Sequence, residues 1–126
     1  IYNNGSVAIG TGSTGTHKLA VEGSIGAREI KVEVGTWSDY VFGENYDLPS
    51  LEEVEKHIRE KGHLINIPSA KEVEENGIEL GEMNRLLLEK IEELTLYVLE
   101  LKNKQVLLEG QNLKLQEEME KLKTDD

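Results

Sequence analysis

Leucine recurs at every seventh position through the last third of the chain. The leucines of this repeat are Leu80, Leu87, Leu94, Leu101, Leu108, Leu115 and Leu122. The companion position, three residues before each leucine from Leu87 onward, carries Asn84, Ile91, Val98, Gln105, Asn112 and Met119. A 3,4 spacing held over six heptads without proline predicts a coiled coil over residues 80–126.

A helix of this kind requires partner chains. At about 1.5 Å per residue it would run roughly 65 Å, and the 79 residues that precede it are too few to cover its apolar side in a compact way. The sequence therefore predicts an elongated molecule and a homo-oligomer, and its strongest signal concerns assembly.

The flanking charges favour parallel helices. In a parallel pair each g residue faces the e residue five positions later on the neighbour. These pairs are Lys90 with Thr95, Tyr97 with Lys102, Lys104 with Glu109, Gln111 with Gln116, and Glu118 with Lys123. No like charges meet, and each exposed ion pair contributes only a few tenths of a kcal/mol.

The number of strands is open from the heptads alone. Ile91 and Val98 above leucine layers favour two strands, whereas Leu88 widens the apolar face and suits a larger bundle. Gln105 and Asn112 at core positions are expected to fix the register at a cost in stability; a bound ion or water on the axis is an alternative use for them. Gly110 costs about 1 kcal/mol per helix relative to alanine, so we expect the end beyond it to fray.

Residues 1–36 have the pattern of short β-strands punctuated by glycine. Apolar residues alternate with small ones around positions 7–9, 19–21, 25–27 and 30–34. Each segment is too short to form an independent sheet. We expect several copies to intertwine into a β shaft around a common axis; the alternative is a small antiparallel sheet within one chain.

Residues 37–79 are predicted to form a small mixed segment. Its aromatic residues Trp37, Tyr40, Phe42 and Tyr46 are the best candidates for a compact core or for an exposed binding surface. Two capped helix starts follow, at Ser50 and Ser69, each with a glutamate three residues on. The helices should end at Gly62 and at Asn76–Gly77, and Gly81 is expected to bend the chain before the coiled coil.

Composition narrows the function classes. The net charge of −11 is carried by the part after Trp37, which has 11 basic and 22 acidic side chains, so binding to nucleic acid or to an anionic membrane is disfavoured. There is no cysteine, and no apolar run is long enough for membrane insertion. The chain begins at Ile1, without a signal-peptide pattern, and we expect it to be a piece of a longer protein.

No enzymatic chemistry is indicated by residue spacing. His17, His57 and His63 have no metal-ligand spacing, and the glutamates around the two short helices suit capping or a solvated face. We therefore expect no enzyme activity, no cofactor and no metal. The acidic residues 72–82 also argue against a DNA-binding leucine zipper, whose basic region would stand there.

Two parts of the sequence resemble known fibre proteins. The strands at 5–11 and 18–25 resemble shaft repeats of phage tail fibres and related trimeric surface fibres. The segments 40–42, 48–54, 62–64, 67–70, 81–83 and 87–95 resemble the C-terminal region of tail-fibre-like proteins common in Bacteroidetes and their phages. One departure is Ile65–Asn66, where this pattern has Pro-Gly.

The arrangement is also similar to the C-terminal intramolecular chaperone of endosialidase-type tail spikes. That resemblance implies an α+β fibrous homotrimer with a β shaft end (1–36), a mixed segment (37–79) and a parallel trimeric coiled coil (80–126). It implies a trimerisation and folding function on a virion tail fibre or extracellular surface fibre. Self-cleavage at a serine is common in that family; Ser38, followed by Asp39, lies at the corresponding junction, although the flanking motif does not match.

A second function is left open by the aromatic residues. Trp37, Tyr40, Phe42 and Tyr46 could form a tip that binds a host receptor or glycan, because aromatic rings stack on sugars. The same residues would also suit a core.

A two-chain assembly would instead favour a dimeric adaptor whose strands pair within each chain.

Overall fold

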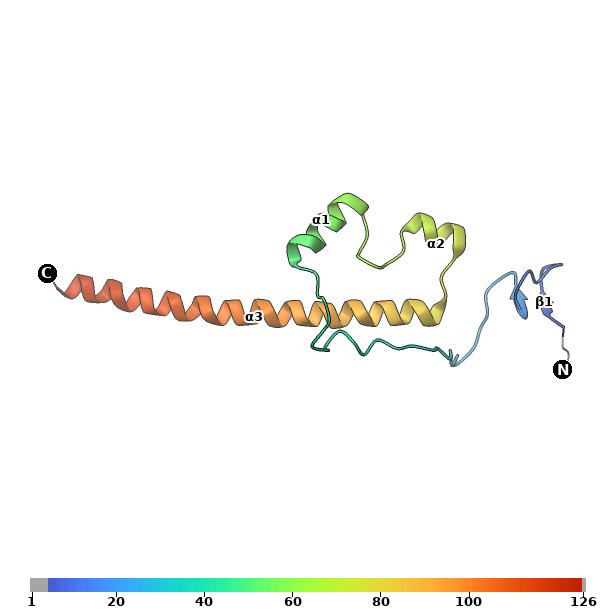
Figure 1. The fold of residues 1–126 in the computed structure, drawn as a ribbon, viewed down its shortest axis with the longest axis horizontal. Coiled ribbons are helices and arrows are strands. Elements are labelled where there is room, and N and C mark those ends of the chain that lie inside the picture. Colours follow the sequence, from blue (N-terminus) through green and yellow to red (C-terminus); the bar gives the residue numbers. More distant parts are fainter. Residues whose placement is uncertain (1–4, 126) are drawn as a thin grey trace. The chain divides into compact units, whose positions relative to one another are not determined.

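The computed structural model describes residues 5–125; the first four residues of the predicted shaft and Asp126 at the end of the predicted coiled coil lie outside the described residues. The fold is mixed, with a small two-stranded sheet, two short helices and one long C-terminal helix (Figure 1). The chain divides into two compact units, Ile1–Lys31 and Val32–Asp126. The predicted long C-terminal helix and the mixed α and β character are confirmed.

The first unit contains two short strands. Strand β1 (Val7–Ile9) pairs in parallel with β2 (Leu19–Val21), and Val7 stands opposite Leu19. Backbone bonds from Val7 N to the Lys18 carbonyl (2.8 Å) and from Glu22 N to the Ile9 carbonyl (2.9 Å) hold the pair together. The strands at these two places are confirmed. They pair within one chain, as in the alternative prediction, but in parallel, so the antiparallel direction of that alternative is wrong.

The strands predicted near 25–27 and 30–34 do not form within one chain. No neighbouring strand is present among the described residues to satisfy their backbone groups, and Ile25 and Ile30 are 63% and 56% exposed. Val32 and Val34 instead lie against the start of the long helix: a Cβ atom added at Gly81 would be 2.8 Å from Val32 Cγ1 and closer still to Val34 Cγ1.

Helix α1 (Leu51–Lys61) begins and ends as its sequence predicts. The Ser50 Oγ atom accepts a bond from Glu53 N (3.1 Å) while Ser50 N donates to the Glu53 carboxylate (3.0 Å), which completes a capping box. Gly62 ends the helix in the left-handed conformation, with φ 76°. The helix is strongly amphipathic in pattern, yet none of its residues is buried.

Helix α2 (Ala70–Asn76) is also preceded by a capping serine and followed by a glycine. Ser69 accepts a bond from Glu72 N (3.2 Å), and Gly77 follows the helix with φ 67°. In the link between α1 and α2, Asn66 adopts φ 65°. Asparagine tolerates this left-handed conformation better than most residues, so Asn66 can form the turn in this link.

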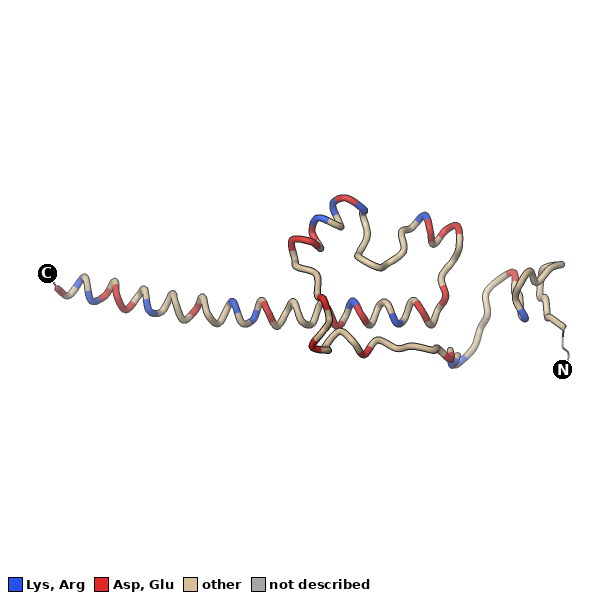
Figure 2. Tube along the Cα trace, in the orientation of Figure 1, with Lys and Arg blue, Asp and Glu red and all other residues tan. Residues whose placement is uncertain are grey.

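Helix α3 (Leu80–Thr124) spans 45 residues. Gly81 lies inside its first turn and is buried, so the predicted bend at Gly81 is wrong: the missing side chain provides room for Val32 and Val34. The helix continues through Gly110 without interruption. Acidic and basic residues are interspersed along it (Figure 2), with salt bridges such as Lys104–Glu100 (3.4 Å) one turn apart.

Candidate functional site

The predicted core of the coiled coil forms an open apolar seam along α3. Its exposed fractions run from 49% at Leu87 to 73% at Leu122. The apolar members are Leu80, Leu87, Ile91, Leu94, Val98, Leu101, Leu108, Leu115, Met119 and Leu122, all of them exposed. Gln105 and Asn112, the two amides of the seam, are exposed as well. The residues that would stabilise an assembly therefore face solvent in a single chain.

Burial on α3 is inverted relative to an ordinary amphipathic helix. Apart from Gly81, its buried residues are Glu89, Glu93 and Tyr97, with 5%, 6% and 8% exposure. They occupy heptad positions f, c and g, outside the a and d seam. The chain's own segment at 38–49 covers this side, so intrachain packing leaves the a and d positions free.

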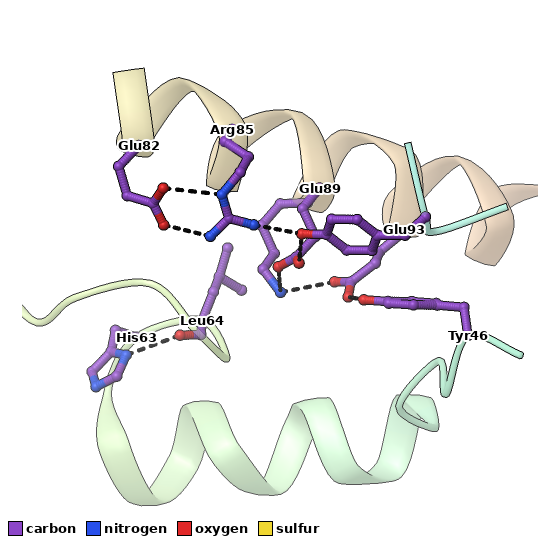
Figure 3. A network of polar contacts seen from close by, with 9 residues as sticks. Tyr46, His63, Leu64, Glu82, Arg85, Glu89 and Glu93 are labelled. Carbon is purple, nitrogen blue, oxygen red and sulfur yellow. Dashed lines mark hydrogen bonds and ion pairs between the residues drawn. The ribbon is translucent and has the colours of Figure 1, made fainter. Parts of the chain in front are cut away.

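Two tyrosines hold that segment on α3 (Figure 3). The Tyr40 hydroxyl donates a hydrogen bond to Glu89 and the Tyr46 hydroxyl donates one to Glu93. Lys90 lies between the carboxylates, with its Nζ atom 3.3 Å from Glu89 Oε2 and 2.9 Å from Glu93 Oε2. We call these five residues the tyrosine clasp.

Arg85 extends the clasp toward the start of α3. Its guanidinium donates to the Tyr40 hydroxyl (2.7 Å) and to the Glu82 carboxylate (3.0 Å from Nε). The hydrogen bond to Arg85 lowers the pKa of Glu82. The clasp therefore alternates cations and acceptors, which is how buried carboxylates are tolerated.

The surroundings of the clasp also raise the pKa values of its two phenols. The hydrogen bond to Glu89, burial and the Glu89 charge together raise the pKa of Tyr40, and burial followed by the bond to Glu93 raises the pKa of Tyr46. Both phenols are therefore protonated donors at neutral pH, which is the state that the two glutamates require.

The four predicted aromatic residues divide into two pairs. Tyr40 and Tyr46 belong to the clasp, with ring centroids 5.8 Å apart. Trp37 and Phe42 are 54% and 61% exposed, so within one chain these two do not belong to the compact core predicted for the aromatic run. The buried apolar residue of this segment is Val41, at 2% exposure.

The weak self-cleavage candidate is buried at 2% exposure. The Ser38 hydroxyl has no hydrogen-bond partner among the described residues, and Asp39 next to it is exposed. A nucleophilic serine needs a base within hydrogen-bond reach. Cleavage stays a prediction that this geometry does not favour.

Two of the three histidines contact each other. The rings of His57 and His63 meet edge to face at 5.4 Å, and His63 Nδ1 lies 2.9 Å from the Leu64 carbonyl. Within residues 5–125 no group of three acidic, histidine or cysteine side chains is placed to hold a metal ion.

Sequence reasoning missed the clasp glutamates. Glu89 and Glu93 stand at outer positions of the heptad, where carboxylates are ordinarily solvated, and their tyrosine partners lie 49 and 47 residues away. The one available signal was the spacing Glu89–Lys90–Glu93, which places one cation between two carboxylates on one side of a helix.

An apolar groove lies beside the seam. It has a volume of about 510 Å³ and is lined by Leu51 and Val54 of α1, by Leu64 and Ile65 of the following link, and by seam residues of α3. Tyr97 borders it and donates a hydrogen bond to the Pro49 carbonyl (2.6 Å), which fixes the start of α1 beside α3. The groove and the seam thus form one continuous apolar surface.

No helix among the described residues is long and apolar enough to cross a membrane. Searches against protein-family models, curated proteins and solved structures found no match to this chain.

Proposed function

We propose that this chain is a C-terminal trimerisation and folding module of a phage tail fibre or a related extracellular surface fibre. The observation that carries the proposal is the seam on α3, whose apolar heptad residues are 49–73% exposed along a helix of 45 residues. Full burial of one leucine contributes about 1.5–3 kcal/mol, so a seam of this length favours assembly strongly.

Assembly would set the register of the N-terminal strands. Strands that pair between chains fold slowly because their contacts are not local, whereas a heptad helix forms locally and raises the effective concentration of the attached strands. The apolar residues left exposed before α3, such as Ile25 and Ile30, would gain neighbours when several copies wrap together.

Three parallel chains are part of the proposal. The resemblance to trimeric fibres and the position of Leu88 beside Leu87 support three rather than two. The parallel direction is supported by complementary flanking pairs such as Lys104 with Glu109 and Glu118 with Lys123.

A pair of leucine variants tests the seam. Leu94 and Leu107 are both 61% exposed in one chain, but Leu94 is a seam position and Leu107 is an outer one. Leu94→Lys should give single chains by light scattering, because a cation would be buried among leucines, whereas Leu107→Lys should keep the assembly. Equal effects of the two variants would refute a heptad interface.

A second candidate function is a tip that binds a host receptor or glycan. Trp37 and Phe42 favour it, because two large aromatic side chains are 54% and 61% exposed and take no part in the clasp. Sugar-array binding that is lost in a Trp37→Ala, Phe42→Ala variant, with the assembly unchanged, would support this function. An array with no binding by the unmodified chain would refute it.

A further inference from the structure

The groove between α1 and α3 has apolar walls that one chain does not fill. Leu51 of α1 is 38% exposed and Leu64 of the link is 44% exposed, although both line the groove. The absence of any buried residue on α1 is unusual for an amphipathic helix fixed at its start by Tyr97 and Pro49. The groove therefore resembles one side of a protein–protein interface.

The α3 residues that line the groove indicate what would bind in it. The α3 side of the groove consists largely of seam residues, namely Leu87, Ile91, Leu94, Val98 and Leu101. The seam then continues through Leu108, Leu115 and Leu122, which are 57%, 57% and 73% exposed. A small ligand or short peptide in the groove would leave that continuation in water, whereas a second copy of α3 would cover both.

The groove also opens on one flank of the seam. Lys90 and Tyr97, both at heptad position g, line it, together with Glu93 at position c. In parallel helices the g flank of one chain meets the e flank of its neighbour. The second copy would therefore turn its e residues, Thr95 and Lys102, toward α1 of the first chain, with Leu99 at position b beside them.

Charge at this flank is complementary. Burial raises the pKa of Tyr97, and the negative charges of Glu93, Glu100 and Glu53 raise it further, so the phenol lies in a negative field to which α1 contributes. Lys102, the residue that meets Tyr97 in the parallel register, makes no hydrogen bond or ion pair within the described part of the chain, whereas Lys104 is paired with Glu100. An ammonium group from the second copy suits this field.

We infer that α1 and the link residues Leu64 and Ile65 form a clamp on a second copy of this chain, closing over the e and b face of its α3 beside Thr95, Leu99 and Lys102. This inference rests on the proposed assembly and adds that the interface extends beyond the heptad seam. In each chain the clamp would contact α3 of the neighbouring chain, while the tyrosine clasp holds the segment before α1 on the chain's own α3.

Cysteine cross-linking tests the clamp cleanly, because the chain contains no cysteine. In a Val54→Cys, Thr95→Cys variant one thiol stands in the lining of the groove, whereas the other stands at an e position of α3 that does not line the groove. A bismaleimide shorter than the helix diameter of about 10 Å should link them between chains, and mixing singly substituted chains separates such links from links within one chain. The matched control, Val54→Cys with Gln116→Cys, uses another e position three heptads further along, outside the groove.

The expected result is that most chains of the Thr95 variant run as covalent species of two or three chains in denaturing gels, while the control variant stays monomeric there. Mixing chains that carry only Val54→Cys with chains that carry only Thr95→Cys should give the two-chain product as well. Each single variant treated alone should not.

The results that would overturn the clamp differ from those that would overturn the proposed assembly. Chains that assemble by light scattering but do not link would overturn the clamp and leave the proposed assembly standing, and so would links formed within one chain or through Gln116→Cys instead. A single-chain mass for the unmodified protein would overturn both.

Discussion

Two glycines in α3 should respond in opposite directions to the same substitution. A Cβ atom at Gly110 would have nothing within 4 Å, and its backbone is helical without a positive φ. Alanine in a helix interior is more favourable than glycine by about 1 kcal/mol, so Gly110→Ala should stabilise each chain by about that amount. In a three-chain assembly the gain would be about 3 kcal/mol.

Gly81→Ala carries the same propensity gain but meets Val32 and Val34. A new Cβ atom would lie 2.8 Å from Val32 Cγ1 and closer still to Val34 Cγ1, far inside ordinary contact distance. Overpacking of this kind costs about 1–3 kcal/mol, which exceeds a gain that is smaller in the first helical turn. The net effect should be destabilising, with residues 32–34 displaced from α3.

The assay is thermal unfolding followed by circular dichroism at one fixed chain concentration, because assembly makes the midpoint concentration-dependent. Hydrogen exchange at residues 32–34 gives the local readout. If Gly81→Ala stabilises the protein as much as Gly110→Ala does, the two valines are not packed against the start of α3. A destabilising Gly110→Ala would equally contradict the placement of that residue in a helix interior.

Three further predictions concern the clasp, the caps and the seam. Folding raises the pKa of Tyr46 above its ordinary 10.0, so the stability that its protonated phenol contributes is complete below pH 10 and is lost as pH rises through the folded-state pKa. Urea unfolding on either side of pH 10 should show this loss of stability. Tyr46→Phe should reduce the pH-dependent loss while costing about 1.5 kcal/mol at neutral pH. Ser50→Ala should cost about 1 kcal/mol in the same assay, and a loss near zero would contradict the capping box. Replacing Gln105 and Asn112 by isoleucine should raise the thermal midpoint and loosen register, whereas an unchanged assembly with an unchanged shaft would count against their role.

Local chemistry made much of this fold predictable. The caps at Ser50 and Ser69 and the ends at Gly62 and Gly77 depend on residues within one helical turn, so their sequence patterns were sufficient. The long helix followed from its heptads in the same way. The left-handed backbone of Asn66 was harder to predict, since asparagine adopts that conformation only in some turns.

The tyrosine clasp could not be predicted from the sequence because its partners are distant along the chain. Glu89 and Glu93 are buried by tyrosines almost 50 residues away, and the spacing Glu89–Lys90–Glu93 alone does not distinguish them from solvated glutamates. Gly81 was misjudged for a similar reason: its lack of a side chain serves Val32 and Val34, not a bend. The heptad positions of the seam, by contrast, follow from their spacing within one helix, and their role in assembly stays a prediction.

The absolute mass of the unmodified chain in solution, measured by light scattering on a sizing column, tests the proposed assembly. We expect three copies of the 14.2 kDa chain. A mass of two copies would contradict the three-chain shaft and favour a dimeric adaptor, and a mass of one copy would contradict the assembly altogether.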